Sequence, residues 1–290
     1  MALATLHRQI TDYMNEKHYY HISTKGLEVD LFKDQEDFRQ ILFIIALTFG
    51  SDPQCEIVCY SIMNNHIHLV VYGVLENIDR QLVSLKKRYS MWYAKKYGVN
   101  KIFWGVPCKI RKCEDHEDVK CCIGYDYYNP VKAGLTNNPF YYPWSSVSAH
   151  FRNEHFIMIS HDNNHTPRAQ RKIIHSHCTL PKGVRLLENG APDPLSLIRP
   201  EHVRDLMRSA KSLNYFIFKS RDGQVNINDT VYLCNDMSAR DKAKEIASRI
   251  CGREANLENL SSELKMEVAN VLKYTYGTPF KVVARILGIK

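Results

Sequence analysis

The 290-residue sequence lacks any apolar run as long as the roughly 18 residues that a membrane-spanning helix needs. Its most apolar stretch, ILFIIALTFG at 41–50, is too short, so a buried helix is the better interpretation. The N-terminal residues also lack the apolar centre of a secretory signal peptide. We therefore expect no association with a membrane.

Cysteine occurs nine times, but without a CxxC pair and without regular spacing. A disulfide framework is therefore not expected, and a reducing cytoplasm is the compartment that fits best. The cluster with the most metal-ligand character contains Cys108, Cys113, His116, Cys121 and Cys122. Structural zinc sites pair their ligands at tight, recurring spacings that this cluster lacks, so reduced core cysteines are the preferred interpretation.

Acidic residues are fewer than basic ones, 31 against 39, which gives a formal net charge of +8. This excess is only a modest indication of a polyanionic partner, because many basic proteins bind no nucleic acid. The hydrophobic share of 44% and the charged share of 24% are typical of an ordinary globular protein.

The first half of the chain alternates between strand-like and helix-like patterns. An aromatic and β-branched run at 18–24 predicts a strand, and the helix that follows has Asp34 as its N-cap. Two strand-like runs then flank Asn64 and Asn65. Asparagine tolerates left-handed backbone, so this pair indicates the tip of a hairpin.

A second helix is expected over roughly 78–97, a strand over 101–110 and a last helix over 114–135. This last helix should end near Asn129, because Pro130 disfavours helix in the residue before it. The order β-α-β-β-α-β-α predicts an α+β fold with a ferredoxin-like antiparallel sheet flanked by helices.

The character of the sequence changes after residue 149, where His, Asn and Pro become frequent. We predict a first domain, a linker or excursion and a small, mainly helical domain, at 1–149, 150–197 and 198–290. Two strand-like runs interrupt the third segment, YFIF at 215–218 and TVYLC at 230–234. Residues 278–290 resemble a truncated helix-turn-helix without its recognition helix, and a plain amphipathic helix is the preferred alternative.

The helix at 78–97 carries a basic run interleaved with aromatic residues. A solvated helix face is the commoner reason for such a run. The alternative is a nucleic-acid surface, because bases stack on rings while cationic side chains hold phosphates. The candidate DNA contacts in this helix are Lys86, Lys87, Arg88, Tyr89, Trp92 and Lys95.

Two histidines, His66 and His68, are separated by one residue in the run that follows the asparagines. Strand side chains alternate faces, so both imidazoles project from one face and could hold a divalent cation. An HxH pair alone is weak evidence, because strands also bury an occasional imidazole. Tyr125 and Asn129 lie four residues apart, hence on one face of the last helix. The Asn129 carbonyl oxygen suits a hard cation such as Mg²⁺ or Mn²⁺, with Tyr125 one turn away as a nucleophile.

Six motifs together resemble the single-tyrosine HUH endonucleases, and most closely the REP-associated tyrosine transposases. They follow that family's order and spacing over about the first half of the chain. The motifs are YHISTKG (20–26), YSIMNNHIHLVV (60–71), LKKRYSMWY (85–93), FWGVPCK (103–109), YDYYNPVKAGL (125–135) and YPWSS (142–146). The combination is specific, although each motif alone is not.

The resemblance implies a metal-dependent endonuclease and strand transferase that acts on single-stranded DNA with hairpin or repeat ends. It implies that His66, His68 and Asn129 are ligands of Mg²⁺ or Mn²⁺. It also implies that Tyr125 attacks phosphorus and forms a 5′-phosphotyrosine. Relatives are both monomers and homodimers, so either state is expected.

The family's tyrosine stands four residues before the asparagine of NPV, which selects Tyr125 over Tyr127 and Tyr128. Asp126 would point away from Tyr125 on a helix and is expected at the surface. The motif FWGVPCK departs from the family, in which an arginine commonly follows the W-Q-G element. Two basic residues near this departure, Lys109 and Arg111, are further candidate DNA contacts.

Three hypotheses follow from these patterns. The first is a DNA-nicking and joining transposase, and the second is a non-catalytic DNA-hairpin-binding protein derived from one. The third is a globular protein whose histidine pair belongs to the core. The complete set of tyrosine, two histidines and asparagine favours the first over the second, because a retired site usually loses a member.

Overall fold

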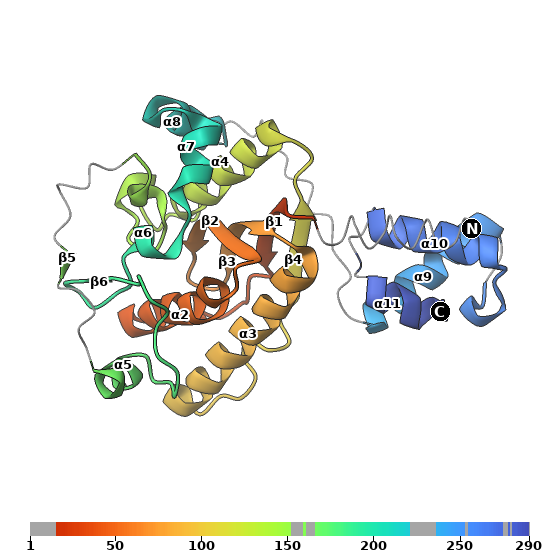
Figure 1. The fold of residues 1–290 in the computed structure, drawn as a ribbon, viewed down its shortest axis with the longest axis horizontal. Coiled ribbons are helices and arrows are strands. Elements are labelled where there is room, and N and C mark those ends of the chain that lie inside the picture. Colours follow the sequence, from red (N-terminus) through yellow and green to blue (C-terminus); the bar gives the residue numbers. More distant parts are fainter. Residues whose placement is uncertain are drawn as a thin grey trace.

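A four-stranded antiparallel sheet forms the centre of the first half of the chain in a computed structural model (Figure 1). The model describes residues 16–151, 159–160, 166–220, 236–252, 255–274, 278 and 280–289. The strands lie in the order β2-β3-β1-β4, and they span β1 His18–Thr24, β2 Cys55–Ile62, β3 Ile67–Gly73 and β4 Cys108–Lys112. The predicted α+β fold, with an antiparallel sheet flanked by helices, is confirmed.

The two faces of the sheet are covered by different helices. Ile22, Leu69 and Ile110 occupy one face and pack with helices α2, Gln35–Thr48, and α3, Leu75–Tyr97. The other face carries His21, Val70 and Arg111, which are cross-strand neighbours, and it lies against helix α4, His116–Lys132. Because strand side chains alternate, this second face receives a polar row in the middle of the molecule.

The predicted N-cap, Asp34, places the start of α2 correctly. Asp34 accepts hydrogen bonds from the backbone N–H groups of Glu36 and Asp37, and Asp37 caps in return, so α2 begins with a complete capping box. Helix α4 begins after Asp115, whose carboxylate accepts from the Asp118 N–H. It continues through Pro130 to Lys132, so the predicted end near Asn129 is wrong by about one turn. The missing N–H of Pro130 costs one intrahelical bond without ending the helix.

The region 101–110, predicted as a strand, forms turns at 101–105 and joins the sheet only at Cys108. Lys101 adopts a left-handed backbone, which breaks an extended run, and the apolar Phe103 is buried without belonging to a strand. The apolar pattern of residues 101–110 therefore indicated that part of the segment is buried, but it did not indicate the secondary structure.

Helices α7, Pro200–Met207, and α8, Ala210–Lys219, pack on α4. The run YFIF, predicted as strand-like, is part of α8, and Leu213, Phe216 and Ile217 form its buried stripe at helical spacing. Gly124 of α4 permits close contact, because a Cβ there would overlap the backbone carbonyl of Phe216. These contacts join residues 200–219 to the core of the first half, while the predicted domain boundaries stay a prediction.

The described parts of 150–197 contain short elements that partly pack on α2. Ile174 and Leu186 bury against Phe43, and Gln40 donates to the Ile174 carbonyl. The short elements between α4 and α7 are η2 Pro139–Tyr141, η3 Val147–Ala149, β5 Ile159–Ser160, α5 Pro167–Ile173, β6 Leu186–Leu187 and α6 Pro194–Leu197.

The C-terminal helices share a hydrophobic cluster of their own. Helix α11 contributes Val282, Val283 and Leu287 to it, as an amphipathic helix would. The elements are α9 Asp236–Cys251, η6 Leu257–Asn259, α10 Ser262–Tyr274 and α11 Phe280–Leu287. The predicted strand-like run at 230–234 lies outside the described residues. Among the described helices, none is both long and apolar enough to cross a membrane.

Candidate functional site

The two histidines of the HxH motif lie side by side at the start of β3. Residues 64 and 65 form the hairpin tip, and His66 closes it by accepting from the Met63 N–H through its carbonyl. The imidazole centroids of His66 and His68 are 4.8 Å apart. His68 is 5% exposed and belongs to β3, whereas His66 just precedes the strand and is half-buried. The predicted alternation therefore does bring both rings to one place.

Helix α4 crosses this face of the sheet and brings two predicted residues to the histidines. The ring centroid of Tyr125 lies 5.8 Å from that of His68 and 6.0 Å from that of His21. One turn further on, the side-chain amide of Asn129 lies 3.3 Å from Nε2 of His68. The four residues predicted from the sequence, His66, His68, Tyr125 and Asn129, thus form one cluster.

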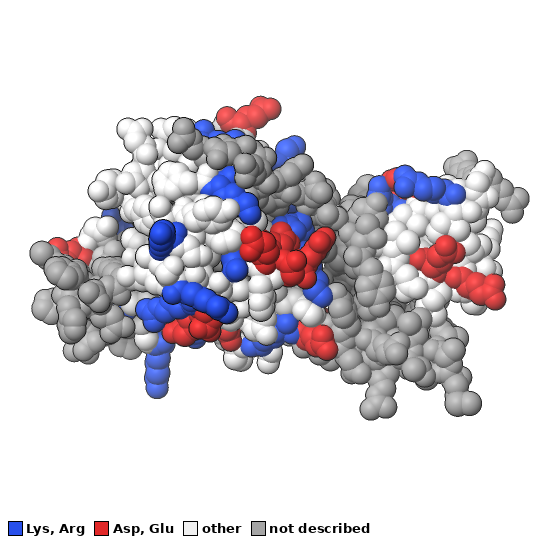
Figure 2. All heavy atoms as spheres, turned by 90° about the horizontal axis from the view of Figure 1, so that it is seen from above, with Lys and Arg blue, Asp and Glu red and all other residues white. Residues whose placement is uncertain are grey.

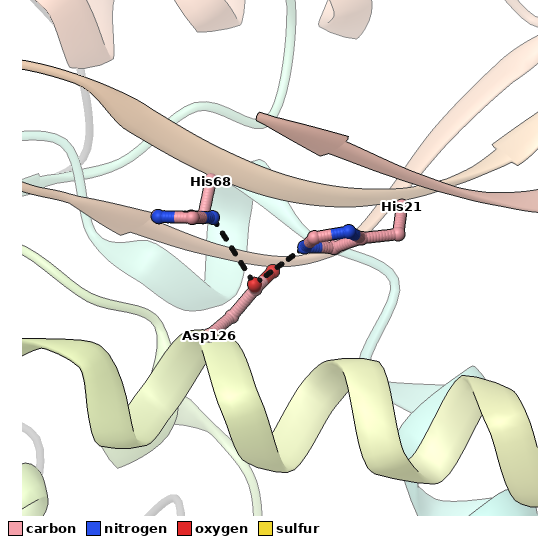
Figure 3. A group of neighbouring side chains, drawn as sticks. All are labelled: His21, His68 and Asp126. Atoms are coloured by element: carbon pink, nitrogen blue, oxygen red, sulfur yellow. Dashed lines mark hydrogen bonds and ion pairs between the residues drawn. The ribbon is translucent and has the colours of Figure 1, made fainter. Parts of the chain in front are cut away.

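Two further residues complete the cluster and were not among the predicted site residues (Figure 3). Asp126 is fully buried, and its Oδ1 lies 2.8 Å from Nε2 of His21 and 3.5 Å from Nδ1 of His68. The expectation that Asp126 lies at the surface is wrong, because α7 and α8 cover the outer side of α4 while Asp126 points into the sheet. His21 and His68 stack with their ring centroids 5.9 Å apart. The pairing of β1 with β3 makes them neighbours, and this register is not visible in the sequence.

Burial disfavours protonation of the two histidines of the HxH motif. It lowers the pKa of His66, and it lowers the pKa of His68 well below its usual value, with the His66 and His21 charges adding to the effect at His68. Both imidazoles are therefore neutral at neutral pH, which is the form that binds a metal ion.

The donor atoms of the cluster are arranged closely enough to bind a cation. The ligand atoms of His21, His68 and Asp126 lie within 4.8 Å of one another, so this group could hold a metal ion. In addition, Nδ1 of His68 is buried without a hydrogen-bond partner at ordinary distance among the described residues. Two imidazoles with oxygen donors from Asp126 and Asn129 form a mixed N/O set, which suits Mg²⁺ less well than Mn²⁺ but is compatible with both.

The two neighbouring tyrosines of α4 point elsewhere. Tyr127 is buried, and its hydroxyl contacts Oγ of Ser146 at 2.8 Å and Nε2 of His150 at 2.5 Å. The ring of Tyr128 packs against Phe218 of α8. Of the three tyrosines in the motif, Tyr125 is the one whose ring lies beside the histidines.

No family model and no curated protein matches this chain. Among solved structures it is similar to the one described as "Structure of the REP associates tyrosine transposase bound to a REP hairpin". The identity is 14% and the TM-score 0.38, and the alignment covers 47% of this chain and 78% of that chain.

Two of the predicted DNA contacts are core residues. Tyr89 is 0% exposed and donates its hydroxyl to the Leu31 carbonyl, and Trp92 is buried beside it. Neither ring is available to stack on a base, so this prediction is wrong for both. Their helical spacing marks the buried stripe of α3, which packs on the sheet and α2.

The basic residues of α3 that were predicted to contact DNA differ from one another in their exposure and hydrogen bonding. Lys87 and Lys95 are exposed on α3, whereas Nζ of Lys86 donates to the Val106 carbonyl. Arg88 contacts Ser84 and Cys178. On the face that Figure 2 shows, basic and acidic side chains are interspersed.

The two basic candidates of β4 lie on the same face as the histidines, by strand alternation. Lys109 pairs with Ser23, which in turn pairs with His68, so Lys109 stands two strands from that histidine. Arg111 pairs with His21, but both terminal nitrogens of its guanidinium bind Asp118, at 2.6 and 2.8 Å. Arg111 is therefore already engaged in a bidentate ion pair.

A second group of metal-ligand types lies beside Arg111. Cys113, Asp118 and Cys122 come together there, and the Arg111 guanidinium donates to both Asp118 and Cys122. The positively charged guanidinium of Arg111 is therefore already bound by two members of this group. All cysteines of the described residues are free.

Proposed function

We propose that this protein is a metal-dependent enzyme that nicks and rejoins single-stranded DNA at hairpin or repeat ends through a tyrosine nucleophile. The observation that carries the proposal is the meeting of Tyr125 with the histidine pair, since its ring centroid lies 5.8 Å from that of His68. The order of the sequence motifs, which resembles that of the REP-associated tyrosine transposases, supports the same chemistry and the hairpin form of the substrate.

His66, His68 and Asn129 would hold the cation, with neutral imidazoles and an amide oxygen as donors. When bound, Mg²⁺ or Mn²⁺ would polarise a phosphate of the DNA and stabilise the charge that develops on it. Lys109, on the same face of the sheet, is suited to a contact with the DNA backbone, because an ammonium group attracts phosphate without reading sequence.

Tyr125 acts as the nucleophile in this proposal. Its Oη forms a bond to phosphorus while the bond from phosphorus to the 3′ oxygen breaks. The phenol loses its proton and the 3′ oxygen gains one, so the products are a 5′-phosphotyrosine and a free 3′-OH. Attack by a 3′-OH on the same phosphorus reverses the step and rejoins a strand.

The test uses the full-length protein and a single-stranded hairpin oligonucleotide labelled at its 3′ end, because the 3′ fragment is the one that stays attached to tyrosine. We expect a covalent protein–DNA band on a denaturing gel with Mn²⁺ and none with EDTA. Tyr125→Phe should reduce this band to background. Tyr128→Phe is the matched control, since it changes the same helix three residues away and should keep the band.

The other outcomes separate the alternatives. Binding of the hairpin by the wild-type protein without a covalent band would refute the proposal and favour a non-catalytic hairpin-binding protein. A band that persists in Tyr125→Phe would refute the assignment of the nucleophile alone.

A further inference from the structure

The buried pair of Asp126 and His21 has no part in the proposed metal ligation, yet it occupies the centre of the site. Asp126 is 0% and His21 2% exposed, and Asp126 projects from α4 between the rings of His21 and His68 (Figure 3). A buried carboxylate is costly unless N–H groups point at it. The two imidazole nitrogens nearest to it belong to His21, at 2.8 Å, and His68, at 3.5 Å.

We propose that Asp126 and His21 are positioning residues that hold His68 with its proton on Nδ1, so that Nε2 is free for the metal ion. This inference rests on the proposed metal site. It assigns Asp126 to orientation of a ligand rather than to ligation, although its carboxylate lies within 4.8 Å of ligand atoms of His21 and His68.

The geometry of His68 supports this division of roles. Its two ring nitrogens face different partners: Nδ1 faces Oδ1 of Asp126 and Nε2 faces the amide of Asn129. The separation of 3.5 Å is an electrostatic contact and not a hydrogen bond: a lone pair on Nδ1 would be repelled by the carboxylate oxygen, whereas a proton there is attracted to it. With the proton on Nδ1, the Nε2 lone pair accepts from the Asn129 amide as observed. If the side-chain amide of Asn129 rotated by 180°, its oxygen would take the place of its nitrogen, and Asn129 and His68 could then bind the same cation.

His66 is held in the same tautomer by a separate contact. Asn65 donates its amide nitrogen to the Leu27 carbonyl at 2.6 Å, which fixes the orientation of the amide. Its Oδ1 therefore faces Nδ1 of His66, at 2.6 Å, and that nitrogen must carry the proton. Both histidines of the HxH motif are thus left with Nε2 as the ligand atom. A hydrogen-bond acceptor behind each ligand histidine is the usual support of a metal site.

His21 supplies the second N–H to Asp126. Its Nε2 lies 2.8 Å from the same Oδ1 that faces His68, and its ring is stacked 18° from parallel with the His68 ring. The hydrogen bond to His21 thereby keeps Oδ1 of Asp126 in place beside Nδ1 of His68. Metal ligation by Oδ1 of Asp126 would compete with its contact to His21, and would use Nδ1 of His68 on the side away from Asn129.

The first test is the tautomer of His68 in the metal-free, full-length protein. Long-range ¹H–¹⁵N spectra of protein labelled with ¹⁵N-histidine distinguish the two tautomers directly. We expect His68 as the Nδ1–H form in the wild type and a mixture of both forms in Asp126→Leu. Asp118→Asn is the matched control, because it changes a carboxylate of the same helix that binds Arg111 instead. It should leave the His68 signals unchanged.

The second test is Mn²⁺ affinity, measured by calorimetry without DNA. Loss of a group that supports a ligand histidine typically weakens metal binding about 10–100-fold, and we expect this range for Asp126→Leu. Asp126→Asn retains an acceptor for His68 and should lose less than Asp126→Leu. His21→Gln keeps an N–H donor and should bind more tightly than His21→Ala. Circular dichroism checks that each variant is folded, and Asp126→Asn serves if Asp126→Leu is not.

An Nε2–H tautomer of His68 in the wild type would overturn the proposal, because Nδ1 would then be the ligand atom and Asp126 a ligand. An unchanged tautomer and Mn²⁺ affinity in Asp126→Leu would overturn it as well. Failure of the proposed function looks different. In that case the Nδ1–H tautomer of His68 would still depend on Asp126, while wild-type protein formed no covalent DNA adduct.

Discussion

Gly124→Ala tests how closely α4, which carries Tyr125, is packed against α8. A Cβ at position 124 would overlap the Phe216 carbonyl oxygen, and would lie 2.6 Å from the Phe216 carbonyl carbon and 3.1 Å from the Ile217 nitrogen. All three are backbone atoms, so no side-chain rotation can relieve the contact. Helix α8 must move away from α4 or α4 must move toward the sheet.

Two opposite effects determine the size of the change. Alanine is the better helix former by about 1 kcal/mol, which would stabilise the variant. Overpacking costs about 1–3 kcal/mol and sometimes more, and the upper end applies when rigid backbone is displaced. A shift of α8 would also loosen the packing of Leu213, Phe216 and Ile217. We therefore expect a net destabilisation of about 2 kcal/mol.

The assay is urea unfolding of the full-length protein, followed by tryptophan fluorescence. The three tryptophans, at 92, 104 and 144, all belong to the half of the chain that contains the sheet. Gly105→Ala is the control, because a Cβ there meets nothing within 4 Å, and its effect should stay within about 0.5 kcal/mol. A Gly124→Ala variant at least as stable as the wild type would refute the close contact between α4 and α8.

Two further predictions concern acid stability and DNA contacts. Burial, with Arg204 adding to it, lowers the pKa of His150 from the usual 6.5 to about 3, so between these values the unfolded chain binds a proton that the folded chain does not. Stability should fall by about 2 kcal/mol from pH 6.5 to pH 5 through this group, and urea unfolding of His150→Gln at both pH values should show a smaller loss. An equal loss in both proteins would contradict this assignment. Replacing the exposed Lys87 and Lys95 together by alanine should weaken binding of single-stranded DNA and lower the slope of log K against log salt by about 1. Tyr89→Phe should leave binding unchanged, because its ring is buried, and weakened binding in this folded variant would refute the core assignment.

Local rules were sufficient to predict much of what the site contains. Spacing by two along a strand brings His66 and His68 together, and spacing by four along a helix places Tyr125 and Asn129 on one face. The pair of asparagines between two strand-like runs predicts the hairpin at 64–65. Each of these inferences depends on backbone periodicity over a few residues, which the sequence specifies directly.

Burial and long-range pairing depend on the whole assembly. The sequence alone marked an apolar and aromatic stripe on α3, but only the packing of that stripe on the sheet showed that Tyr89 and Trp92 belong to the core. The run 215–218 has β-branched and aromatic character, and its helical state follows from its contact with α4. In both cases tertiary packing decides among the conformations and roles that local propensity allows.

The sequence by itself determined the order of the elements in the first half of the chain, the α+β class and the residues that the HxH strand and the tyrosine helix contribute. The tertiary structure alone decided that His21 and Asp126, 105 residues apart, meet at 2.8 Å. The register of β1 on β3 and the side of α4 that faces the sheet bring them together. These are set by the burial of the whole apolar surface, which no short stretch of sequence encodes.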